Sequence, residues 1–200
     1  MKTRLVLITS GIVWLLAVVA GLGVMLNYEN SPGVAATAPV QWPTNSRIRL
    51  APDRPTLVML AHPRCPCTRA SIGELALLMA RCQGKVTAYV LFLKPAGTAS
   101  DWAKTDLWQS AAAIPGVQVV RDDGGVEARR FGVETSGQTM LFDSAGRLLF
   151  SGGITAARGH SGDNAGRSVI VSLLTTGMAE RHQTFVFGCS LRDPAKSLSE

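Results

Sequence analysis

The sequence predicts an α/β sandwich that is preceded by one transmembrane helix. Segments with strand-like and helix-like patterns alternate from about residue 47 to residue 190. Their order, β-α-β-α-β-α-β-β-α, is typical of parallel inner strands that are followed by an antiparallel hairpin. Before them stands a run of 22 residues without a charged side chain, 5–26. These observations divide the chain into a membrane segment and one outer domain.

The uncharged run is long enough to cross a membrane. At about 1.5 Å per residue it spans roughly 33 Å as a helix, which matches the apolar core of a bilayer. A cleavable signal peptide is the alternative, since the small residues of VAATA (34–38) suit cleavage. The apolar region of a signal peptide is only about 7–15 residues long, however. We therefore expect residues 1–27 to form an uncleaved signal anchor.

The charges beside the span predict its orientation. Lys2 and Arg4 precede it and Glu29 follows it, so the positive-inside rule places the N-terminus inside and the domain outside. The domain then faces an oxidising compartment, in which cysteine pairs persist. Residues 28–46 are rich in Pro, Ala, Ser, Thr and Asn and carry no apolar period, so we expect a flexible linker. The outer domain is expected over 47–190 and a C-terminal tail over 191–200.

Five strands and four helices are expected in the outer domain. The apolar run TLVMLAH is typical of a buried strand, and Ile72, Leu75 and Met79 recur at helical spacing. An Asp-Asn cap and the stop at Gly177 frame the last helix. The expected strands are 56–62, 85–94, 117–123, 138–143 and 147–153, and the expected helices are 68–81, 100–114, 125–131 and 163–177.

Composition excludes several classes of function. The chain is 46% hydrophobic and 17% charged, with a formal net charge of +6. Its basic residues form no run of five and do not interleave with aromatic residues, so we expect no nucleic-acid partner. The sequence holds neither G-x-S-x-G nor H-E-x-x-H, and the loop GHSGDNAG lacks the G-K-[ST] ending of a phosphate loop.

The segment HPRCPC, residues 62–67, is the strongest candidate site. It lies where a buried strand ends and a helix begins, and Pro66 suits the first helical position. Cys65 then lies at the cap and Cys67 in the first turn, where the unpaired backbone N–H groups favour a thiolate. We expect a redox pair in which Cys65 is the nucleophile and Cys67 the resolving thiol. A disulfide between residues one apart closes a small, strained ring, which makes it more oxidising.

Three alternatives remain for this motif. Cys65, Cys67 and His62 could bind Cu(I) or Zn(II), with His160 as a possible fourth ligand, because thiolates and imidazole suit these ions. A single thiol could attack peroxide, or both thiols could be inert. A redox pair of Cys65 and Cys67 requires no cofactor, so copper is expected only if the metal-binding alternative is correct.

Two further cysteines have open roles. Cys82 shares an apolar stripe with Met79, so we expect a buried core thiol. Cys189 lies beyond the last helix, where it could reach Cys65 as a third thiol, pair with Cys82, or stay free.

Two histidines and one acidic residue are further candidates near the site. His62 could favour the Cys65 thiolate by its positive charge. His160 lies in a Gly-rich loop whose composition is typical of a site rim, and Glu74 is expected to be a surface carboxylate.

The segments TLVMLAHPRCPCTRASIGELALLM and TSGQTMLFDSAGRLLFSGGI resemble the active-site segment and the closing hairpin of thioredoxin-like proteins. The resemblance covers about residues 50–176. It is strongest to membrane-anchored thiol–disulfide oxidoreductases of bacterial envelopes, to peroxiredoxin-like relatives, and to the RedB-type branch. It implies a three-layer sandwich, with helices on both faces of a mixed sheet, in the periplasm or exterior and anchored in the inner membrane by residues 5–26. It also implies partners that are protein thiols or disulfides of the envelope.

The chain departs from this family in three places. The usual C-x-x-C is shortened to C-P-C, so the family's redox potential does not carry over. The substrate-binding cis-proline loop of the family aligns with Ser136-Gly137, where Gly137 takes the proline's place and is expected to leave the face above Cys65 more open. Peroxiredoxins carry Thr or Ser three residues before the nucleophile, where this chain has His62, so peroxidase activity is the weaker alternative.

Overall fold

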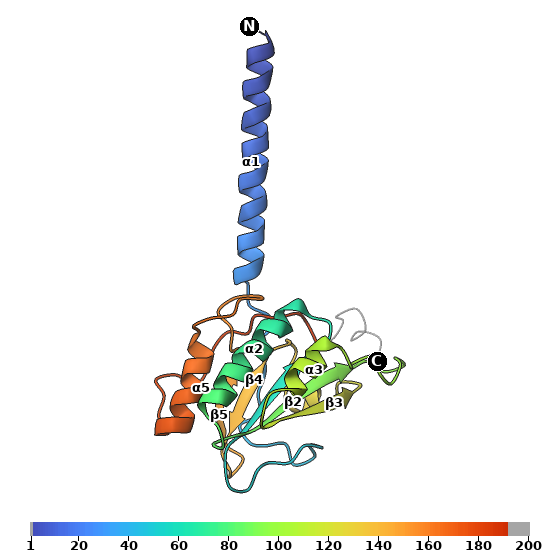
Figure 1. The fold of residues 1–200 in the computed structure, drawn as a ribbon, viewed down its shortest axis with the longest axis vertical. Coiled ribbons are helices and arrows are strands. Elements are labelled where there is room, and N and C mark those ends of the chain that lie inside the picture. Colours follow the sequence, from blue (N-terminus) through green and yellow to red (C-terminus); the bar gives the residue numbers. More distant parts are fainter. Residues whose placement is uncertain (1, 192–200) are drawn as a thin grey trace.

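A computed structural model describes residues 2–191 of the chain (Figure 1). Its helices are α1 (Lys2–Asn30), α2 (Pro66–Arg81), α3 (Asp106–Ala112), α4 (Val126–Arg130) and α5 (Ala165–Thr176). Its strands are β1 (Thr56–Ala61), β2 (Thr87–Lys94), β3 (Val117–Asp123), β4 (Thr139–Phe142) and β5 (Leu148–Gly152).

The strands form one mixed sheet with the order β3-β2-β1-β4-β5. The pairs β1–β2 and β2–β3 are parallel, whereas β1–β4 and β4–β5 are antiparallel. The three parallel strands are followed along the chain by the antiparallel hairpin β4–β5, as the sequence predicts. The parallel strands carry α2 and α3 in their crossovers, and α5 follows the hairpin.

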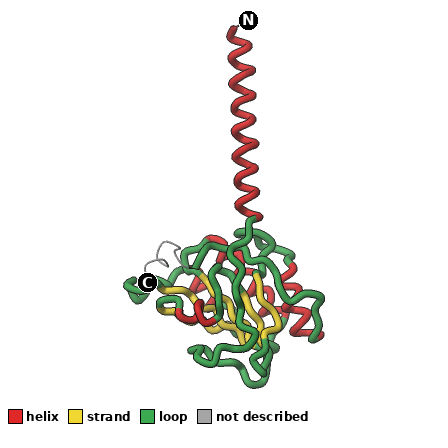
Figure 2. The backbone as a smooth tube through the Cα atoms, turned by 180° about the vertical axis from the view of Figure 1, so that it is seen from behind, coloured by secondary structure: helices red, strands yellow, loops and turns green. Residues whose placement is uncertain are grey.

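Both faces of the sheet are covered, and β1 shows why. Leu57 and Met59 of β1 pack into a core with α2, α3 and α5, while Val58 and Leu60 pack into a second core with α4. A strand buried on both faces needs apolar residues at every position, and all six residues of β1 are buried. Figure 1 shows α2, α3 and α5 in front of the sheet, and Figure 2 shows the opposite face with its covering of loops. The predicted three-layer fold is confirmed.

The predicted elements agree with the structure except at one helix start. A helix was expected from residue 100, because Ser100 and Asp101 make a good cap, but α3 begins at Asp106 behind the N-cap residue Thr105. Residues 100–103 form a turn instead, in which the backbone N–H of Trp102 donates to Ala99 O at 3.1 Å. The Thr105 hydroxyl donates to Pro63 O at 2.9 Å, which fixes the start of α3 beside the turn after β1.

Helix α1 stands apart from the domain, as Figure 1 shows. It is 29 residues long with a mean hydropathy of 2.5, and none of its residues is buried. Its length and composition suit a membrane span or a signal sequence. Only its last turn touches the domain, where the backbone N–H of Arg158 donates to Glu29 O at 3.0 Å and the Arg158 guanidinium lies 4.9 Å from the ring centroid of Tyr28.

The expected flexible linker is a packed segment in the structure. It forms no helix or strand of its own, yet Trp42 packs edge-on against Phe131 and Phe142, with ring centroids 5.3 and 5.2 Å apart. The Trp42 N–H donates to Gly146 O at 2.7 Å. Farther along, Ser46 donates to the buried Glu127 at 2.7 Å. An irregular segment stays packed on a domain when an aromatic side chain and hydrogen bonds hold it. The Pro- and Ala-rich composition of residues 28–46 gave no indication that Trp42 would pack in this way.

The chain after α5 returns along the edge of the sheet. Gln183 forms an isolated parallel bridge with Ser151 of β5, and the N–H of Gly153 donates to Phe185 O at 3.2 Å. The chain then crosses to the end of the sheet where α2 begins. We name residues 183–191 the C-terminal strap. Of the predicted tail 191–200, only Leu191 is described; it is buried, and residues 192–200 lie outside the described part of the chain.

Candidate functional site

The candidate site is built at the junction between β1 and α2. After Ala61, the chain makes a turn in which the N–H of Cys65 donates to His62 O at 3.2 Å. Cys65 is the N-cap residue, Pro66 follows at the first helical position, and no side chain hydrogen-bonds to cap the helix. The junction is therefore as predicted, with Cys67 in the first turn. The helix N-terminus presents its partial positive charge to both sulfur atoms.

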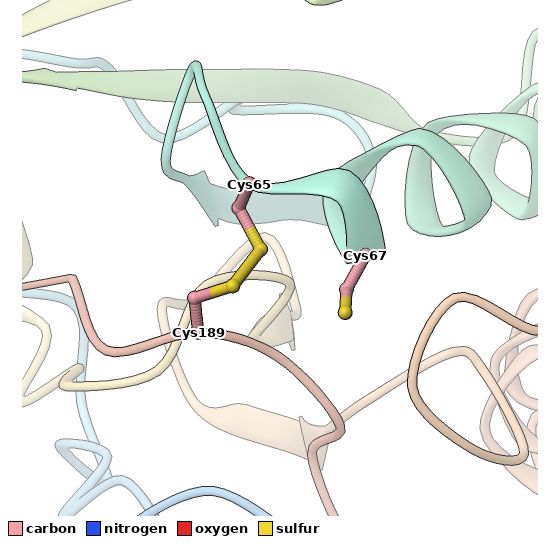
Figure 3. A group of neighbouring side chains, drawn as sticks. All are labelled: Cys65, Cys67 and Cys189. Atoms are coloured by element: carbon pink, nitrogen blue, oxygen red, sulfur yellow. A yellow bond between two sulfur atoms is a disulfide. The ribbon is translucent and has the colours of Figure 1, made fainter. Parts of the chain in front are cut away.

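Three sulfur atoms meet at this junction (Figure 3). Those of Cys65, Cys67 and Cys189 all lie within 4.8 Å of one another. Cys65 forms a disulfide with Cys189, across 124 residues of sequence and a Cα–Cα distance of 6.2 Å, while Cys67 is a free thiol. The structure thus brings together the two predicted cysteines, and it adds Cys189 in the role of a third sulfur. Cys82, the other suggested partner of Cys189, is free and buried.

The loop that precedes β4 faces the cysteines. The Ser136 hydroxyl lies 2.8 Å from the Thr68 hydroxyl and accepts from the His62 N–H at 2.8 Å. The N–H of Ser136 donates to Cys189 O at 2.8 Å. Ser136 therefore contacts the turn after β1, helix α2 and the C-terminal strap. The family resemblance pointed to this loop but not to the contact between Ser136 and Thr68. Small hydroxyl residues give no sequence signal of a contact between segments that are distant along the chain.

Gly137 follows in this loop with φ +89°. Its N–H donates to Leu60 O at 2.8 Å. A Cβ added at Gly137 would lie 2.8 Å from the Ser71 hydroxyl oxygen. A proline has no N–H and a fixed negative φ, so it cannot substitute for this glycine. The expectation of a more open face above Cys65 is wrong: the strap covers it, and Cys65 is only 2% exposed.

His62 does not have the properties of a cationic tuner. Burial, and then the positive charge of Arg64, lower the pKa of His62 from its ordinary value, which favours the neutral imidazole. Its Nδ1 accepts from the Arg64 N–H at 3.1 Å, and its ring packs edge-on against Trp102 with centroids 5.7 Å apart. A neutral ring supplies no charge to stabilise a thiolate.

The alternative metal ligands do not converge as expected. Within the described residues, the cluster with ligand atoms in range is Cys65, Cys67 and Cys189, and it contains neither histidine. His160 is exposed, and its Nδ1 lies 2.9 Å from Arg158 O. Any soft-metal site here would therefore be a three-thiolate site.

The prediction that Glu74 is a surface carboxylate is wrong. Glu74 is fully buried on α2 and forms an ion pair with Arg167 of α5. It also accepts from the Gly162 N–H at 2.8 Å and from the Asn164 side chain at 3.0 Å. A buried carboxylate is stable only when paired and hydrogen-bonded. Glu74 thus ties Gly162, Asn164 and Arg167 to the helix that carries the cysteines.

Comparison with known proteins gives structural neighbours only. No protein-family model matches the sequence, and no curated protein matches it. A hypothetical protein from Sinorhizobium meliloti is 18% identical with a TM-score of 0.59, and the match covers 80% of this chain and 93% of that one. An uncharacterised conserved protein from Geobacillus kaustophilus is 16% identical with a TM-score of 0.59, covering 82% and 94%.

A more distant match has a described activity. A secreted disulfide oxidoreductase of Mycobacterium tuberculosis is 14% identical with a TM-score of 0.44, and the match covers 62% of this chain and 81% of that one. The strand order of the sheet, its antiparallel closing hairpin and the cysteine turn after β1 decide the fold. The chain has a thioredoxin-like fold. Within this thioredoxin-like frame, the cysteines lie at the helix start where the sequence placed them.

Proposed function

We propose that the chain is an envelope thiol–disulfide oxidoreductase that exchanges disulfides with protein partners through Cys65 and Cys67. The observation that carries the proposal is the group of three sulfur atoms within 4.8 Å of one another at the start of α2. Exchange requires a thiolate close to a disulfide sulfur. The free Cys67 beside the Cys65–Cys189 bond meets this requirement.

The exchange reaction conserves atoms and electrons in two steps. The Cys65 thiolate attacks one sulfur of a partner disulfide, which forms a mixed disulfide and releases the other partner sulfur as a thiolate. The Cys67 thiolate then attacks Cys65, which forms the Cys65–Cys67 disulfide and releases the partner with two electrons and two protons gained. The reverse sequence oxidises a partner dithiol, and the potential of the partner sets the direction.

The proposed location is the inner membrane, with the N-terminus inside and the domain in the periplasm or exterior. Lys2 and Arg4 before the span support this orientation. A disulfide in the domain supports an oxidising compartment. The contacts of Arg158 with the last turn of α1 and with Gly188 support a cysteine site on the side of the domain that adjoins the anchor. The RedB-type relationship remains a prediction of the sequence.

Trapping of mixed disulfides tests this function. Two sulfur atoms lie near Cys65, so both potential resolving thiols have to be removed. In the cell, the double variant Cys67→Ser, Cys189→Ser is expected to accumulate mixed disulfides with envelope proteins, detected on non-reducing gels and identified by mass spectrometry. Adding Cys65→Ser should remove every adduct. Adducts that persist without Cys65, or their complete absence from the double variant, would contradict the proposal.

A second candidate function is Cu(I) binding by the reduced chain. The observation that favours it is the same sulfur group, since soft thiolates select Cu(I). Titration of the reduced full chain with Cu(I) against a colorimetric chelator tests it. One bound ion, with affinity at least tenfold lower in Cys189→Ser and unchanged in Cys82→Ser, would support a three-thiolate site. An absence of stoichiometric binding would exclude it.

A further inference from the structure

The C-terminal strap contacts the site in an ordered way beyond the disulfide itself. The N–H of Ser136 donates to Cys189 O at 2.8 Å, and the N–H of Leu191 donates to Glu134 O at 2.7 Å. Between them, Ser190 forms an antiparallel bridge with Thr135. Residues 189–191 are therefore an extended peptide that is paired with the loop before β4 and joined through its cysteine to Cys65.

The side chains of the strap alternate as in a bound strand. The Cys189 sulfur is directed to Cys65 and Ser190 is exposed. Leu191 is only 3% exposed and packs in the core on the α4 face of the sheet. In peptide recognition by strand addition, backbone hydrogen bonds provide affinity and pockets for alternate side chains provide specificity. The pattern here is a cysteine followed two residues later by an apolar residue.

The strap approaches the loop so closely that its sequence is restricted. A Cβ added at Gly188 would overlap the carbonyl oxygen of Ser136. The Arg158 guanidinium donates to Gly188 O and, at 3.1 Å, to Ser31 O. Upstream, Val186 O accepts from the Gly33 N–H at 2.8 Å. The strap is thus held by hydrogen bonds that do not depend on the disulfide.

We propose that the C-terminal strap is an internal substrate. It occupies the place where an extended, cysteine-containing polypeptide pairs with residues 134–136 and exchanges with Cys65, so a partner has to displace it. This inference rests on the proposed function and adds the class of substrate: extended polypeptides with an apolar residue two positions after the reactive cysteine. An occupant on the same chain competes at high effective concentration, so the strap also regulates access.

Release of the strap needs no external oxidant. The Cys67 thiolate attacks Cys65, which forms the Cys65–Cys67 bond and breaks the Cys65–Cys189 bond. The electron pair passes to the Cys189 sulfur, which takes up a proton in place of the one that Cys67 lost. The strap is then held only by its noncovalent contacts, and a partner thiol can attack the Cys65–Cys67 bond.

Capture of a peptide by the reduced full chain tests the inference. The chain carries Cys67→Ser and Cys189→Ser, so that an adduct at Cys65 persists. The probe is a capped peptide with the sequence of residues 187–191, FGCSL, whose cysteine carries nitrothiobenzoate as leaving group. Attack by Cys65 joins the peptide to the chain and releases coloured nitrothiobenzoate. The matched peptide has an N-methyl group on its leucine, which removes the N–H that pairs with Glu134 O.

Two rate ratios are expected. Methylation should slow capture about fivefold, which corresponds to about 1 kcal/mol for one net hydrogen bond. Gly188→Ala, which crowds the strap against Ser136, should speed capture several-fold, and Arg158→Gln is a second variant that weakens the strap by another contact. Gly73→Ala is the matched control, since an added Cβ there meets nothing nearer than the Ser161 hydroxyl at 3.9 Å.

The outcomes separate the inference from the proposed function. Equal rates for the two peptides, together with rates unchanged by Gly188→Ala and Arg158→Gln, would overturn the internal substrate. If Cys65 still reacts with the small disulfide dithiobis-nitrobenzoate in that case, the exchange function stands. If Cys65 reacts with neither peptide nor small disulfide in any variant, the proposed function fails as well.

Discussion

Helix α2 has two cysteines at its N-terminus and a single cysteine at its C-terminus, and the two ends differ in their sulfur neighbours and in their place on the helix dipole. Cys65 and Cys67 lie at the N-terminus, with a third sulfur within 4.8 Å. Cys82 is the C-cap residue, fully buried, and its N–H donates to Leu78 O at 2.9 Å. The same residue type, on the same helix, thus lies once beside two other sulfur atoms and once in the apolar core.

Electrostatics separates the two ends, whereas burial does not, since Cys65, Cys67 and Cys82 are all buried. The helix dipole favours an anion at its N-terminus and disfavours one at its C-terminus. Burial raises the pKa of the Cys82 thiol, and the nearby Lys85 and Arg81 oppose this only in part. A buried thiol that keeps its proton is a poor nucleophile. The proposed difference in reactivity between the two ends of α2 therefore rests on position along the helix.

The largest expected effect comes from removing the exchanging sulfur. Cys65→Ser is expected to lower the rate of disulfide exchange with a model dithiol at least about 100-fold, because the remaining thiols lack an exchanging partner at the helix cap. Cys82→Ser, the matched change at the other end of α2, should stay within about twofold. Stopped-flow measurement of thiol release on the full chain in detergent decides this, and equal losses in the two variants would remove the distinction between the ends.

The next largest effect concerns the middle of α2, which holds both ends in place. Glu74→Gln should lower the free energy of unfolding by about 3 kcal/mol, because it leaves the Arg167 guanidinium only partly paired in a buried site. Asp106→Asn, which breaks the exposed Arg69–Asp106 pair, should lower the free energy of unfolding far less, because solvent screens that pair. Urea unfolding of the full chain gives both values. A cost below 1 kcal/mol for Glu74→Gln would mean that the pair does not fix the helix.

A smaller effect is expected at the loop that faces the reactive end. Gly137→Ala places a Cβ at positive φ and 2.8 Å from the Ser71 hydroxyl oxygen, and it should cost about 2 kcal/mol of stability. Adding Ser71→Ala should recover part of this loss, since it removes the crowded atom. Thermal unfolding of the single and double variants measures the coupling. An identical loss in both would show that backbone strain alone is responsible.

The smallest effect is a pH dependence at the inert end. The folded-state pKa of Cys82 is raised above its ordinary value near 9.0. The stabilisation from the buried, protonated thiol is therefore complete below that value and is lost as pH rises through the raised pKa. As pH rises above about 9, the stability of the wild type should fall more than that of Cys82→Ala, as measured by urea unfolding at each pH. Equal slopes for the two proteins would contradict the assigned burial.

Much of the fold follows from local patterns in the sequence. All six residues of β1 are apolar or small enough to be buried, and the apolar spacing of Ile72, Leu75 and Met79 defines α2. The cap pattern Ser100-Asp101 predicts too early a start for α3, because residues 100–103 form a turn and the helix begins only at Asp106. The composition of residues 28–46 predicts a flexible linker and cannot show the docking of Trp42, which depends on two phenylalanines distant in sequence.

The site was predictable only as far as its residues are neighbours in sequence. Pro66 after Cys65 marks the helix start, so the position and order of Cys65 and Cys67 could be derived. Cys189 reaches Cys65 through an irregular strap, whose path is set by contacts with β5 and Ser136 rather than by periodicity. Glu74 and Arg167 are 93 residues apart, and a carboxylate on a helix gives no local sign of a buried partner.

One measurement tests the division between the two ends of α2 most directly. The full chain is equilibrated across a series of glutathione redox buffers, its free thiols are alkylated, and each cysteine is quantified by mass spectrometry. We predict that Cys65, Cys67 and Cys189 share one disulfide that forms and breaks within the series, while Cys82 stays a thiol throughout. Oxidation of Cys82 together with any of the other three, or four free thiols at every potential, would contradict this prediction.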